Sequence, residues 1–455
     1  MVSAAEQLAS SLSWDSFVKA KDLHKRLLFT VGALIVFRLG SYIPLPGIDT
    51  IVMQELVSQH SGGLLSILDR FSGGALGRMS IFALGVMPYI SASIIIQLLS
   101  ATSSSLNALK KEGSAGRRKL NQYTRYFTVI LCLIQSYGVS RGLETMSGPS
   151  GDVIVCQGIL FHFTSVVTLT GGVLFLMWLG EQIVSRGVGN GISLLIFSGI
   201  VASLPQALAL MLDLGRTTFS SLFMFLMFFS LVVIIFLIVY IERAQRRILI
   251  QYPKRQVGKK MFGGDSSHMP IKINVAGVIP PIFASSILTL PTTITNFSGS
   301  MDGFMGNLLS FFSPTHSFYL VLYVLLIFFF AFFYTLIVFN PKETSDNLRK
   351  NGGFIPGYRP GDNTTDYITY LLNRLTLVGA TYLALICVVP EILISKYSLP
   401  FVLGGTSFLI VVSVSIDTVT QIHSYILSHQ YNGLIERMQF GKFGKKSKGR
   451  GGRIR

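Results

Sequence analysis

Long apolar runs separated by short polar segments dominate the hydropathy pattern of the chain. About 20 consecutive apolar residues are needed to span the hydrocarbon core of a bilayer as a helix. By that rule, the expected membrane-spanning helices are ten in number and cover residues 25–43, 77–100, 121–142, 158–180, 190–212, 218–241, 272–296, 317–339, 370–390 and 401–425. The pattern therefore predicts an all-α membrane protein.

Three segments outside the main apolar runs each lead to a separate prediction. Residues 441–455 consist mostly of Gly, Lys and Arg, so we expect them to be disordered in isolation. Residues 62–75 contain an apolar stretch that is bracketed by glycines and too short to span, which predicts a re-entrant or capping half-helix. Residues 1–26 are polar and no small-residue cleavage site follows the first apolar run, so we expect that run to remain as the first span.

The composition agrees with a membrane protein. Half of the 455 residues are hydrophobic, only 13% are charged, and the mean hydropathy is +0.57. A soluble chain carries about 25% charged residues. The 38 Lys and Arg exceed the 21 Asp and Glu by 17, which indicates cytoplasmic loops that face anionic lipid, RNA or an acidic partner.

The distribution of Lys and Arg predicts the orientation. With a cytoplasmic start and an even number of spans, the segments on the side opposite the cytoplasm hold only Arg70, Arg78, Arg141, Arg216 and Lys396. The remaining loops and the tail then carry most of the positive charge, as the positive-inside bias requires. We therefore expect both termini on the cytoplasmic side.

Motifs for catalysis, nucleotides or metals are absent from the sequence. It contains no GxxxxGK[ST], HExxH or GxSxG pattern. Cys132, Cys156 and Cys387 have no disulfide or metal spacing and are interpreted as free thiols. His162 and His423 are isolated in the sequence and are interpreted as hydrogen-bonded or interfacial residues. We therefore expect no enzymatic activity, no cofactor and no metal site.

Two charges fall inside predicted spans, Arg38 in the first and Asp417 in the tenth. An intramembrane charge is a functional hypothesis by default. Two charges on different helices form neither a proton relay nor a catalytic pair, so satisfaction by helix packing is the favoured interpretation for each.

The predicted spans divide into two kinds. The sixth and eighth contain uniformly apolar stretches, 223–229 and 326–330, that suit contact with lipid. The second, fifth, seventh and tenth mix small with β-branched residues, which fits either the buried helices of a bundle or the lining of a path. Such a path would be apolar and without a charged ring, unlike that of an ion channel or proton-coupled transporter. An apolar constriction dewets and blocks ions, yet gives way to an arriving polypeptide.

Specific motifs then follow one another along nearly the whole chain. They are FALGVMPYISASI at 82–94, KKEG at 110–113 with GRRK at 116–119, QYTRY at 122–126, WLGEQ at 178–182, GVGNGIS at 187–193, ER at 242–243 with QRR at 245–247, AGVIP at 276–280, FNPKET at 339–344, RPG at 359–361 and GGTS at 404–407. In this order they closely resemble the SecY family, the channel subunits of the bacterial Sec protein translocon.

The resemblance implies a fold of ten transmembrane helices in two pseudo-symmetric inverted halves of five around a central hourglass pore. The halves would be residues 1–212 and 213–428, followed by a basic cytoplasmic tail at 429–455. Inverted halves are common among membrane transport proteins. The implied function is a protein-conducting channel that moves unfolded secretory proteins across the cytoplasmic (inner) membrane and inserts membrane proteins laterally into it.

Site residues follow from the resemblance, motif by motif. The apolar pore ring would consist of Val86, Ile90, Ile192, Ile196, Ile282 and Ile410. Val86 stands where Ile is the familiar choice and is one methylene smaller. The plug that seals the resting pore would include Leu64, Leu65, Ile67, Leu68 and Phe71, with only its position carried over. The side gate, where a signal sequence enters between helices, would use Ser91, Ser93, Gln97, Ser286 and Leu290.

The cytoplasmic loops 243–272 and 340–366 match the family's docking site for the SecA ATPase and the ribosome. The expected contact residues are Arg246, Arg247, Lys254, Arg255 and Arg359. Basic side chains there would neutralise phosphates of ribosomal RNA, which makes docking dependent on salt. The alternative is that these charges serve only membrane topology.

The resemblance also implies partners. They are the SecE and SecG subunits, SecA, the ribosome near its exit tunnel, signal peptides and nascent chains, and anionic lipids. Because the sequence has no nucleotide motif, the energy would come from SecA or the translating ribosome.

Two rival functions stay open from the residues alone. An inverted-repeat solute transporter predicts paired charges or ion sites at mid-membrane, and an intramembrane hydrolase predicts a catalytic constellation. Replacing Asp417 with Asn separates both from a conduit, which is expected to tolerate the change or lose only stability.

Overall fold

The structure is a computed structural model that describes residues 21–59, 72–145, 147–148, 151–155, 158–217, 221–253, 255–257, 260–262, 266–297, 317–397 and 404–447. The helices are α3 Lys21–Gly40, α4 Thr50–Gln59, α6 Met87–Thr102, α7 Ser104–Lys111, α8 Ser114–Thr145, α9 Ile159–Arg186, α10 Gly191–Thr217, α11 Ser221–Arg243, α12 Ile279–Phe297, α14 Ser317–Val338, α15 Pro341–Lys350, α16 Asp362–Tyr397 and α17 Gly405–Ser447. The strands are β1 Ser147–Gly148, β2 Gly151–Asp152, β3 Gln245–Gln251, β4 Arg255–Val257, β5 Lys260–Phe262 and β6 Ser266–Lys272.

The helices follow the hydropathy pattern closely. Each apolar range expected to span the membrane overlaps one helix among α3, α6, α8, α9, α10, α11, α12, α14, α16 and α17. By length and composition, 6 of the described helices can cross a bilayer: α9, α10, α11, α14, α16 and α17, with α14 continuing into α15. The bent pair α6–α7, which turns through 103°, brings that number to 7. Within α12, the apolar helical stretch is shorter, Ile279–Leu288.

The second predicted span starts later than hydropathy indicates. The helix begins at Met87 rather than near residue 77, and the preceding residues form turns. Gly85 has a φ of +56° and Met79 a φ of +45°, and such left-handed backbone interrupts a helix. Pro88 then occupies the first turn, where the missing N–H is tolerated. The apolar run 77–86 therefore leads into the helix as a folded loop.

The basic tail also differs from expectation. Helix α17 continues to Ser447, so residues 441–447 are helical rather than disordered. Adding a residue to an existing helix is much easier than nucleating a new one, and Lys is a good helix former. The long uninterrupted helix therefore accounts for the difference.

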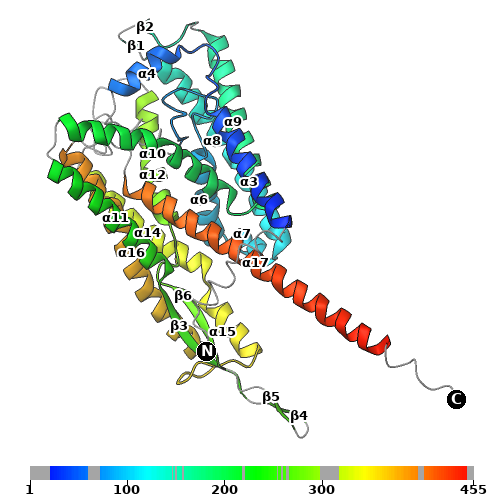
Figure 1. The fold of residues 1–455 in the computed structure, drawn as a ribbon. Helices are drawn as coiled ribbons and strands as arrows, with labels where there is room; N and C mark the ends of the chain where they lie inside the picture. Colours follow the sequence, from blue (N-terminus) through cyan, green and yellow to red (C-terminus); the bar gives the residue numbers. More distant parts are fainter. Residues whose placement is uncertain are drawn as a thin grey trace.

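The helices pack as a bundle with two sides. Figure 1 shows α3, α8 and α9 together on one side and α11, α14 and α16 on the other. Contacts between these sides run through α10 against α17, and through α12 against α6 and α8. Strands β1 and β2 lie at one end with α4, whereas β3–β6 and α15 lie at the opposite end (Figure 1).

Glycines permit the closest helix approaches. A Cβ on Gly172 of α9 would overlap the carbonyl oxygen of Ile81. A Cβ on Gly191, the first residue of α10, would overlap the carbonyl oxygen of Gly180 in α9. Gly405, the first residue of α17, meets the carbonyl oxygen of Ile386 in α16 in the same way. Small residues at such crossings let backbones approach and pack in membrane proteins.

Two hairpins stand in the expected loop 243–272, so the chain is not wholly helical. Strands β3 and β6 pair antiparallel from Gln245↔Lys272 to Gln251↔Ser266, and β4 pairs with β5. Along β3 the exposed and buried positions alternate from Arg247 to Gln251. Ile248 and Ile271 are buried in a small cluster with Ile368 and Leu372 of α16, which holds the β3–β6 hairpin against the bundle.

The two uniformly apolar helices differ in burial. In α11, large apolar side chains such as Phe225, Phe229 and Phe236 are exposed, as expected for contact with lipid. In α14, Ile327 and Phe330 are buried, and Phe330 packs edge-on against Phe283 of α12. The prediction that 326–330 is a lipid-facing segment is therefore wrong for one face of α14, because α12 and α16 cover it.

Candidate functional site

The six expected pore-ring residues come together in one hydrophobic cluster. Ile90, Ile196 and Ile410 are buried in it together with Val86, and Ile192 and Ile282 are partly buried and pack against it. The six residues come from α6, α10, α12 and α17, which are distant in sequence, and the cluster is the large apolar core that also takes in α3, α9, α11, α14 and α16. Among the described residues, Glu242 is the only acidic or basic residue that is buried.

Each ring residue lies at the start of its helix. Val86 is the N-cap of α6, and Ile90 lies in the first turn of that helix. Ile192, Ile282 and Ile410 lie within the first two turns of α10, α12 and α17, respectively. All six expected ring positions therefore lie at or near the start of a helix.

Helices α6 and α12 are in contact beside this cluster. Ser286 Oγ of α12 lies 3.9 Å from Met87 Sδ of α6. The same hydroxyl donates within its own helix to the Ile282 carbonyl, at 2.8 Å. Ser286 is buried, so a polar side chain lies within this interface, and Ser91 of α6 is buried as well.

The other expected gate residues bond locally or lie outside the description. Gln97 Nε2 donates to Ser93 Oγ one turn earlier, at 3.1 Å. The Gln97 Oε1 atom is buried without a hydrogen-bond partner among the described residues. The Leu290 side chain is not described, and the plug residues Leu64, Leu65, Ile67, Leu68 and Phe71 lie outside the described residues.

The structure joins the two expected docking loops. Gln251 at the end of β3 and Phe354 in the second loop exchange two backbone hydrogen bonds, at 2.9 and 3.0 Å. Ile355 joins Ile248 and Ile271 in one buried cluster. Ser345 Oγ of α15 donates to the Gly361 carbonyl at 2.8 Å, which closes the second loop on itself. One continuous surface results, and we call it the docking face.

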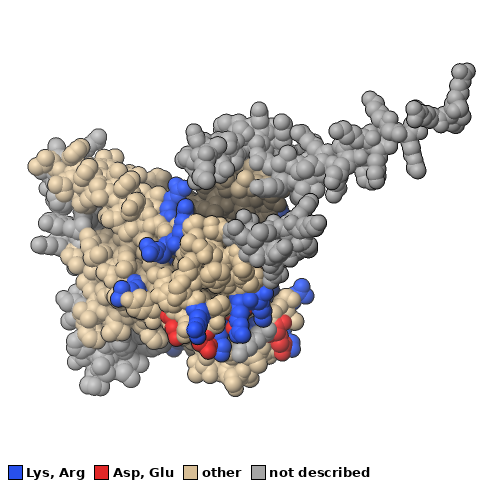
Figure 2. All heavy atoms as spheres, turned by 90° about the horizontal axis from the view of Figure 1, so that it is seen from below, with Lys and Arg blue, Asp and Glu red and all other residues tan. Residues whose placement is uncertain are grey.

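The docking face is basic. Arg246, Arg247 and Arg359 are exposed, and none of them forms an ion pair within the described part of the chain. Figure 2, viewed from this end, shows Lys and Arg side chains spread over the surface with a smaller group of Asp and Glu. Lys254 lies outside the described residues, and the side chain of Arg255 in β4 is not described.

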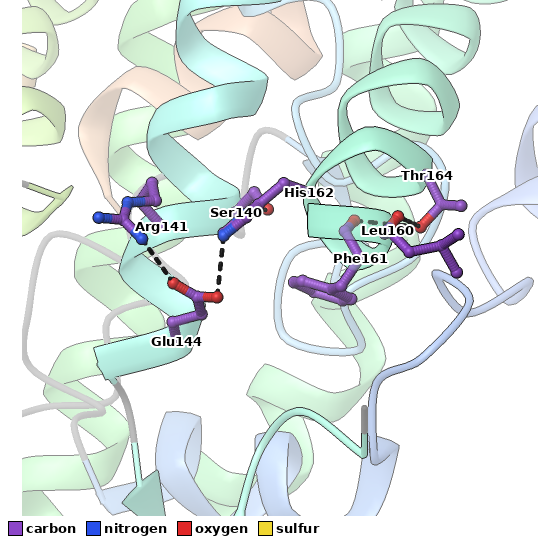
Figure 3. Close-up of polar contacts among 7 residues, drawn as sticks. All are labelled: Ser140, Arg141, Glu144, Leu160, Phe161, His162 and Thr164. Atoms are coloured by element: carbon purple, nitrogen blue, oxygen red, sulfur yellow. Dashed lines mark hydrogen bonds and ion pairs between the residues drawn. The ribbon is translucent and has the colours of Figure 1, made fainter. Parts of the chain in front are cut away.

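His162 is not isolated in space. Its Nδ1 lies 2.6 Å from Ser140 Oγ, and its Nε2 lies 2.8 Å from Glu144 Oε1. Ser140 and Glu144 are four residues apart on α8 and therefore share one helix face, whereas His162 belongs to α9 (Figure 3). Arg141 Nη1 donates to the second Glu144 oxygen at 2.9 Å. The expectation of a hydrogen-bonded histidine is confirmed.

Ser140, His162 and Glu144 are the residue types of a hydrolytic triad, but a substrate cannot reach the serine. Ser140 is fully buried within α8. A nucleophilic serine must instead be reachable by substrate and lie beside donors for an oxyanion. The arrangement connects α8 to α9 and does not support a hydrolase.

Glu144 has two partners, His162 and Arg141, and we predict that replacing His162 destabilises the protein more than replacing Arg141. Replacing His162 with Ala removes both contacts of a side chain that is only 16% exposed and leaves Ser140 Oγ buried without its ring partner. We expect a loss of about 1–3 kcal/mol in the free energy of unfolding. Replacing Arg141, whose side chain is 54% exposed, is expected to lose only about 0–1 kcal/mol.

Thermal unfolding of the purified protein in detergent, followed by size-exclusion chromatography, measures both changes. Equal melting temperatures for the His162→Ala and Arg141→Ala variants would contradict a structural role for the histidine.

The two intramembrane charges have partners. Arg38 Nη1 donates to the Gly73 carbonyl at 2.6 Å, and its guanidinium lies 5.0 Å from the centre of the Tyr42 ring. Asp417 is exposed and lies 3.6 Å from Lys272 Nζ at the end of β6. The interpretation of Asp417 as satisfied inside the helix packing is wrong, because it lies at the surface beside the hairpin.

The amino-acid sequence matches a known family over most of its length. The family model described as SecY matches residues 80–419. Protein translocase subunit SecY of Rickettsia conorii is 52% identical over 419 residues, which cover 92% of this chain and 97% of the relative. The protein of the same name from Escherichia coli K12 is 48% identical over 427 residues, which cover 93% of this chain and 96% of the relative.

Solved structures share the fold at low sequence identity. A structure of a protein-conducting channel has a TM-score of 0.65 at 15% identity, covering 89% of this chain and 93% of that one. Sec61 in the canine ribosome–channel complex from the endoplasmic reticulum has a TM-score of 0.61 at 15% identity, with the same coverage. The arrangement of the helices is therefore that of these channels.

Proposed function

The chain belongs to the SecY family, and from that membership we propose that it carries unfolded secretory proteins across the cytoplasmic membrane and releases apolar segments sideways into lipid. As a member of this family it is a membrane-embedded translocon channel subunit and not an enzyme. The observation that carries the proposal is that six apolar residues near the starts of four helices lie in or against a core in which Glu242 is the only buried acidic or basic residue among those described.

An apolar constriction explains how the channel stays closed to ions yet passes many sequences. Water leaves a narrow apolar passage, and a hydrated ion then faces a high barrier. A polypeptide brings its own side chains and replaces the missing contacts, so the ring closes around it without a specific binding site. The plug at residues 62–75 adds a second seal in this proposal.

The contact between α6 and α12 is proposed as the side gate. Buried Ser91 and Ser286 make this interface less apolar than a lipid-facing surface, so an apolar signal segment can compete for the same position. Transfer into lipid favours each Leu, Ile, Phe or Val by about 0.3–0.6 kcal/mol and opposes each Asp, Lys or Arg by about 2.5–3.5 kcal/mol. Sufficiently apolar segments therefore leave sideways, and polar segments continue across.

The docking face is proposed as the site where the driving partner binds. Its exposed Arg246, Arg247 and Arg359 have no described acidic partners and remain available to an anionic surface. That partner is either SecA or the translating ribosome, whose RNA phosphates attract arginine. If these loops served only to set the orientation in the membrane, they would not need to be hydrogen-bonded to each other through Gln251 and Phe354.

The wider architecture follows the same proposal. Residues 1–212 and 213–428 form two inverted halves of five spans, with both termini and the basic tail at 429–455 in the cytoplasm and with SecE and SecG as neighbours. The similar starts of α10 and α17 support this: Gly191 and Gly405 each meet a backbone carbonyl of the preceding long helix.

A reconstituted transport assay tests the proposed function. The chain is placed with SecE in sealed vesicles, and SecA, ATP and a secretory precursor are added outside. Precursor that becomes protected from external protease, in proportion to ATP hydrolysis, is the expected result. No protection, with the complex intact and SecA bound, would favour the inverted-repeat solute transporter.

Arg359→Glu is the matching test of the docking face. Reversing this exposed charge is expected to lower precursor protection about ten-fold at a limiting SecA concentration, which corresponds to about 1.4 kcal/mol of binding free energy. Lys342→Glu is the control, because Lys342 is also an exposed cation of the second loop. Protection that survives Arg359→Glu would keep the conduit and remove Arg359 from the docking site.

A further inference from the structure

One buried carboxylate lies where the docking hairpin joins the bundle. Glu242, in the last turn of α11, is 5% exposed and is the only buried acidic or basic residue in the described part of the chain. Burying a carboxylate is unfavourable unless hydrogen bonds replace its hydration. Its surroundings therefore indicate what the position is for.

Two oxygens of Glu242 face two different elements. Asn274 Nδ2 donates to Oε2 at 3.2 Å and also to the Gly277 carbonyl at 3.1 Å. Ser413 Oγ of α17 lies 3.5 Å from Oε1, a long contact between two buried groups. Asn274 and Ser413 are themselves 3% and 2% exposed, so both contacts lie away from the surface.

The first contact closes the base of the β3–β6 hairpin. Strand β3 begins at Gln245, just after Glu242, and β6 ends at Lys272, just before Asn274. Ile273 N also donates to the Ala244 carbonyl at 3.1 Å. One backbone bond and one carboxylate–amide bond therefore hold the two ends of the hairpin together.

The second contact reaches α17, the helix that carries the expected pore-ring residue Ile410. Ser413 lies three residues after Ile410, about one turn along α17. The same carboxylate thus contacts the root of the hairpin and the helix that supplies a pore-ring residue.

We call the contacts of Glu242 with the hairpin base and with α17 the joint. Other polar groups surround it. Lys272 and Asp417 form an exposed pair at 3.6 Å between β6 and α17, and both act electrostatically on Glu242. The base of the hairpin, α11 and α17 therefore meet around one carboxyl group.

We propose that Glu242 is a positioning residue that fixes the docking hairpin to α17, so that a partner bound to the hairpin displaces the helix carrying Ile410. The inference rests on the proposed function, because it concerns how docking reaches the pore. Without the joint, a partner still binds the exposed arginines but moves the hairpin independently of the pore helix.

Ser413→Ala is the decisive variant. It removes the contact between the carboxylate and α17 while leaving the contact with Asn274 at the hairpin base. Ser415→Ala is the matched control, since Ser415 Oγ donates only to the Val411 carbonyl of its own helix. Glu242→Ala removes both contacts, and Ser413→Ala keeps the test decisive if Glu242→Ala fails to fold.

A distance measurement reads the joint directly. Spin labels are attached at Ser267 of β6 and Thr420 of α17, both exposed, in the full chain with its native cysteines replaced. The distance distribution between them is expected to broaden at least two-fold in Ser413→Ala and to stay unchanged in Ser415→Ala. An unchanged distribution in both Ser413→Ala and Glu242→Ala would overturn the proposal.

The transport assay then measures how efficiently ATP hydrolysis by the bound partner drives transport of the precursor. Precursor protected per ATP hydrolysed is expected to fall at least three-fold in Ser413→Ala, with SecA affinity within two-fold of the wild type. An equal loss of affinity and transport would overturn the proposal, because the carboxylate would then shape the docking face itself. If the wild type transports nothing, the proposed function fails, and the spin-label distance, which needs no partner, still decides the positioning role.

Discussion

Asparagine in place of Ile410 is expected to make the resting channel leak ions. Ile410 is 1% exposed and lies among apolar side chains of the pore cluster. A buried amide without partners is unfavourable by about 1–3 kcal/mol, and water entering the constriction relieves that strain. Because 1.4 kcal/mol corresponds to a factor of ten, we expect at least about a ten-fold rise in resting conductance.

Planar-bilayer recordings of the purified complex without a substrate polypeptide measure this leak. Ile410→Leu, which keeps the apolar character, is expected to remain sealed. Val419→Asn adds the same amide to an exposed position of the same helix and is expected to leave the conductance unchanged. A folded Ile410→Asn channel that conducts no more than wild type would remove Ile410 from the constriction.

Alanine at Gly172 is expected to destabilise the fold severely, whereas alanine at the adjacent Gly171 is expected to be harmless. The new Cβ at Gly172 would overlap the backbone oxygen of Ile81, which cannot move without displacing the turn before α6. Overpacking costs about 1–3 kcal/mol in ordinary cores, and a rigid backbone partner places this case at the upper end. At Gly171 nothing lies within 4 Å, so the helix preference for Ala over Gly, about 1 kcal/mol, is retained.

The pair of variants is compared by the yield of monodisperse protein and by its melting temperature in detergent. The expected order is Gly171→Ala at or above wild type and Gly172→Ala well below it. Equal stability of the two variants would show that α9 does not pack against the Ile81 segment as closely as described. The comparison is sharp because the two residues differ only in the helix face that they occupy.

Hydropathy predicted the long helices because each must present an apolar surface of bilayer length, as in 158–180 and α9. The hydropathy pattern misplaced the start of α6, because hydropathy reports the polarity of side chains and not the conformation of the backbone. Residues 77–86 are apolar, yet left-handed backbone at Met79 and Gly85 makes them a loop.

The strands were missed for a related reason. The segment Arg246-Arg247-Ile248-Leu249-Ile250 is short, and the basic residues at its start mask the alternation that appears once Ile248 and Ile250 are seen to be buried. The pairing of Gln251 with Phe354 joins positions about a hundred residues apart, which no local pattern indicates.

Candidate site residues were predictable only in part. The motif resemblance selected the six ring positions. All six lie in or against the large apolar core of the bundle, and their role as a ring stays a prediction. The sequence pattern indicated an isolated His162, because its partners Ser140 and Glu144 lie on another helix, α8, and are not adjacent to it along the chain. Glu242 stood within a recognised motif, but its burial and its contact with Ser413 appear only in three dimensions.

The start of several helices at the pore cluster has an electrostatic consequence. Each helix N-terminus carries about half a positive elementary charge from its aligned peptide dipoles. Val86, Ile192, Ile282 and Ile410 lie at or near the starts of four helices, so four such positive ends belong to the elements that carry the proposed ring. In the proposed channel, a dewetted ring of low dielectric strengthens their repulsion of a cation. The backbone itself would thus add a barrier to sodium ions and protons, and help to preserve the membrane's ion gradients while the channel rests.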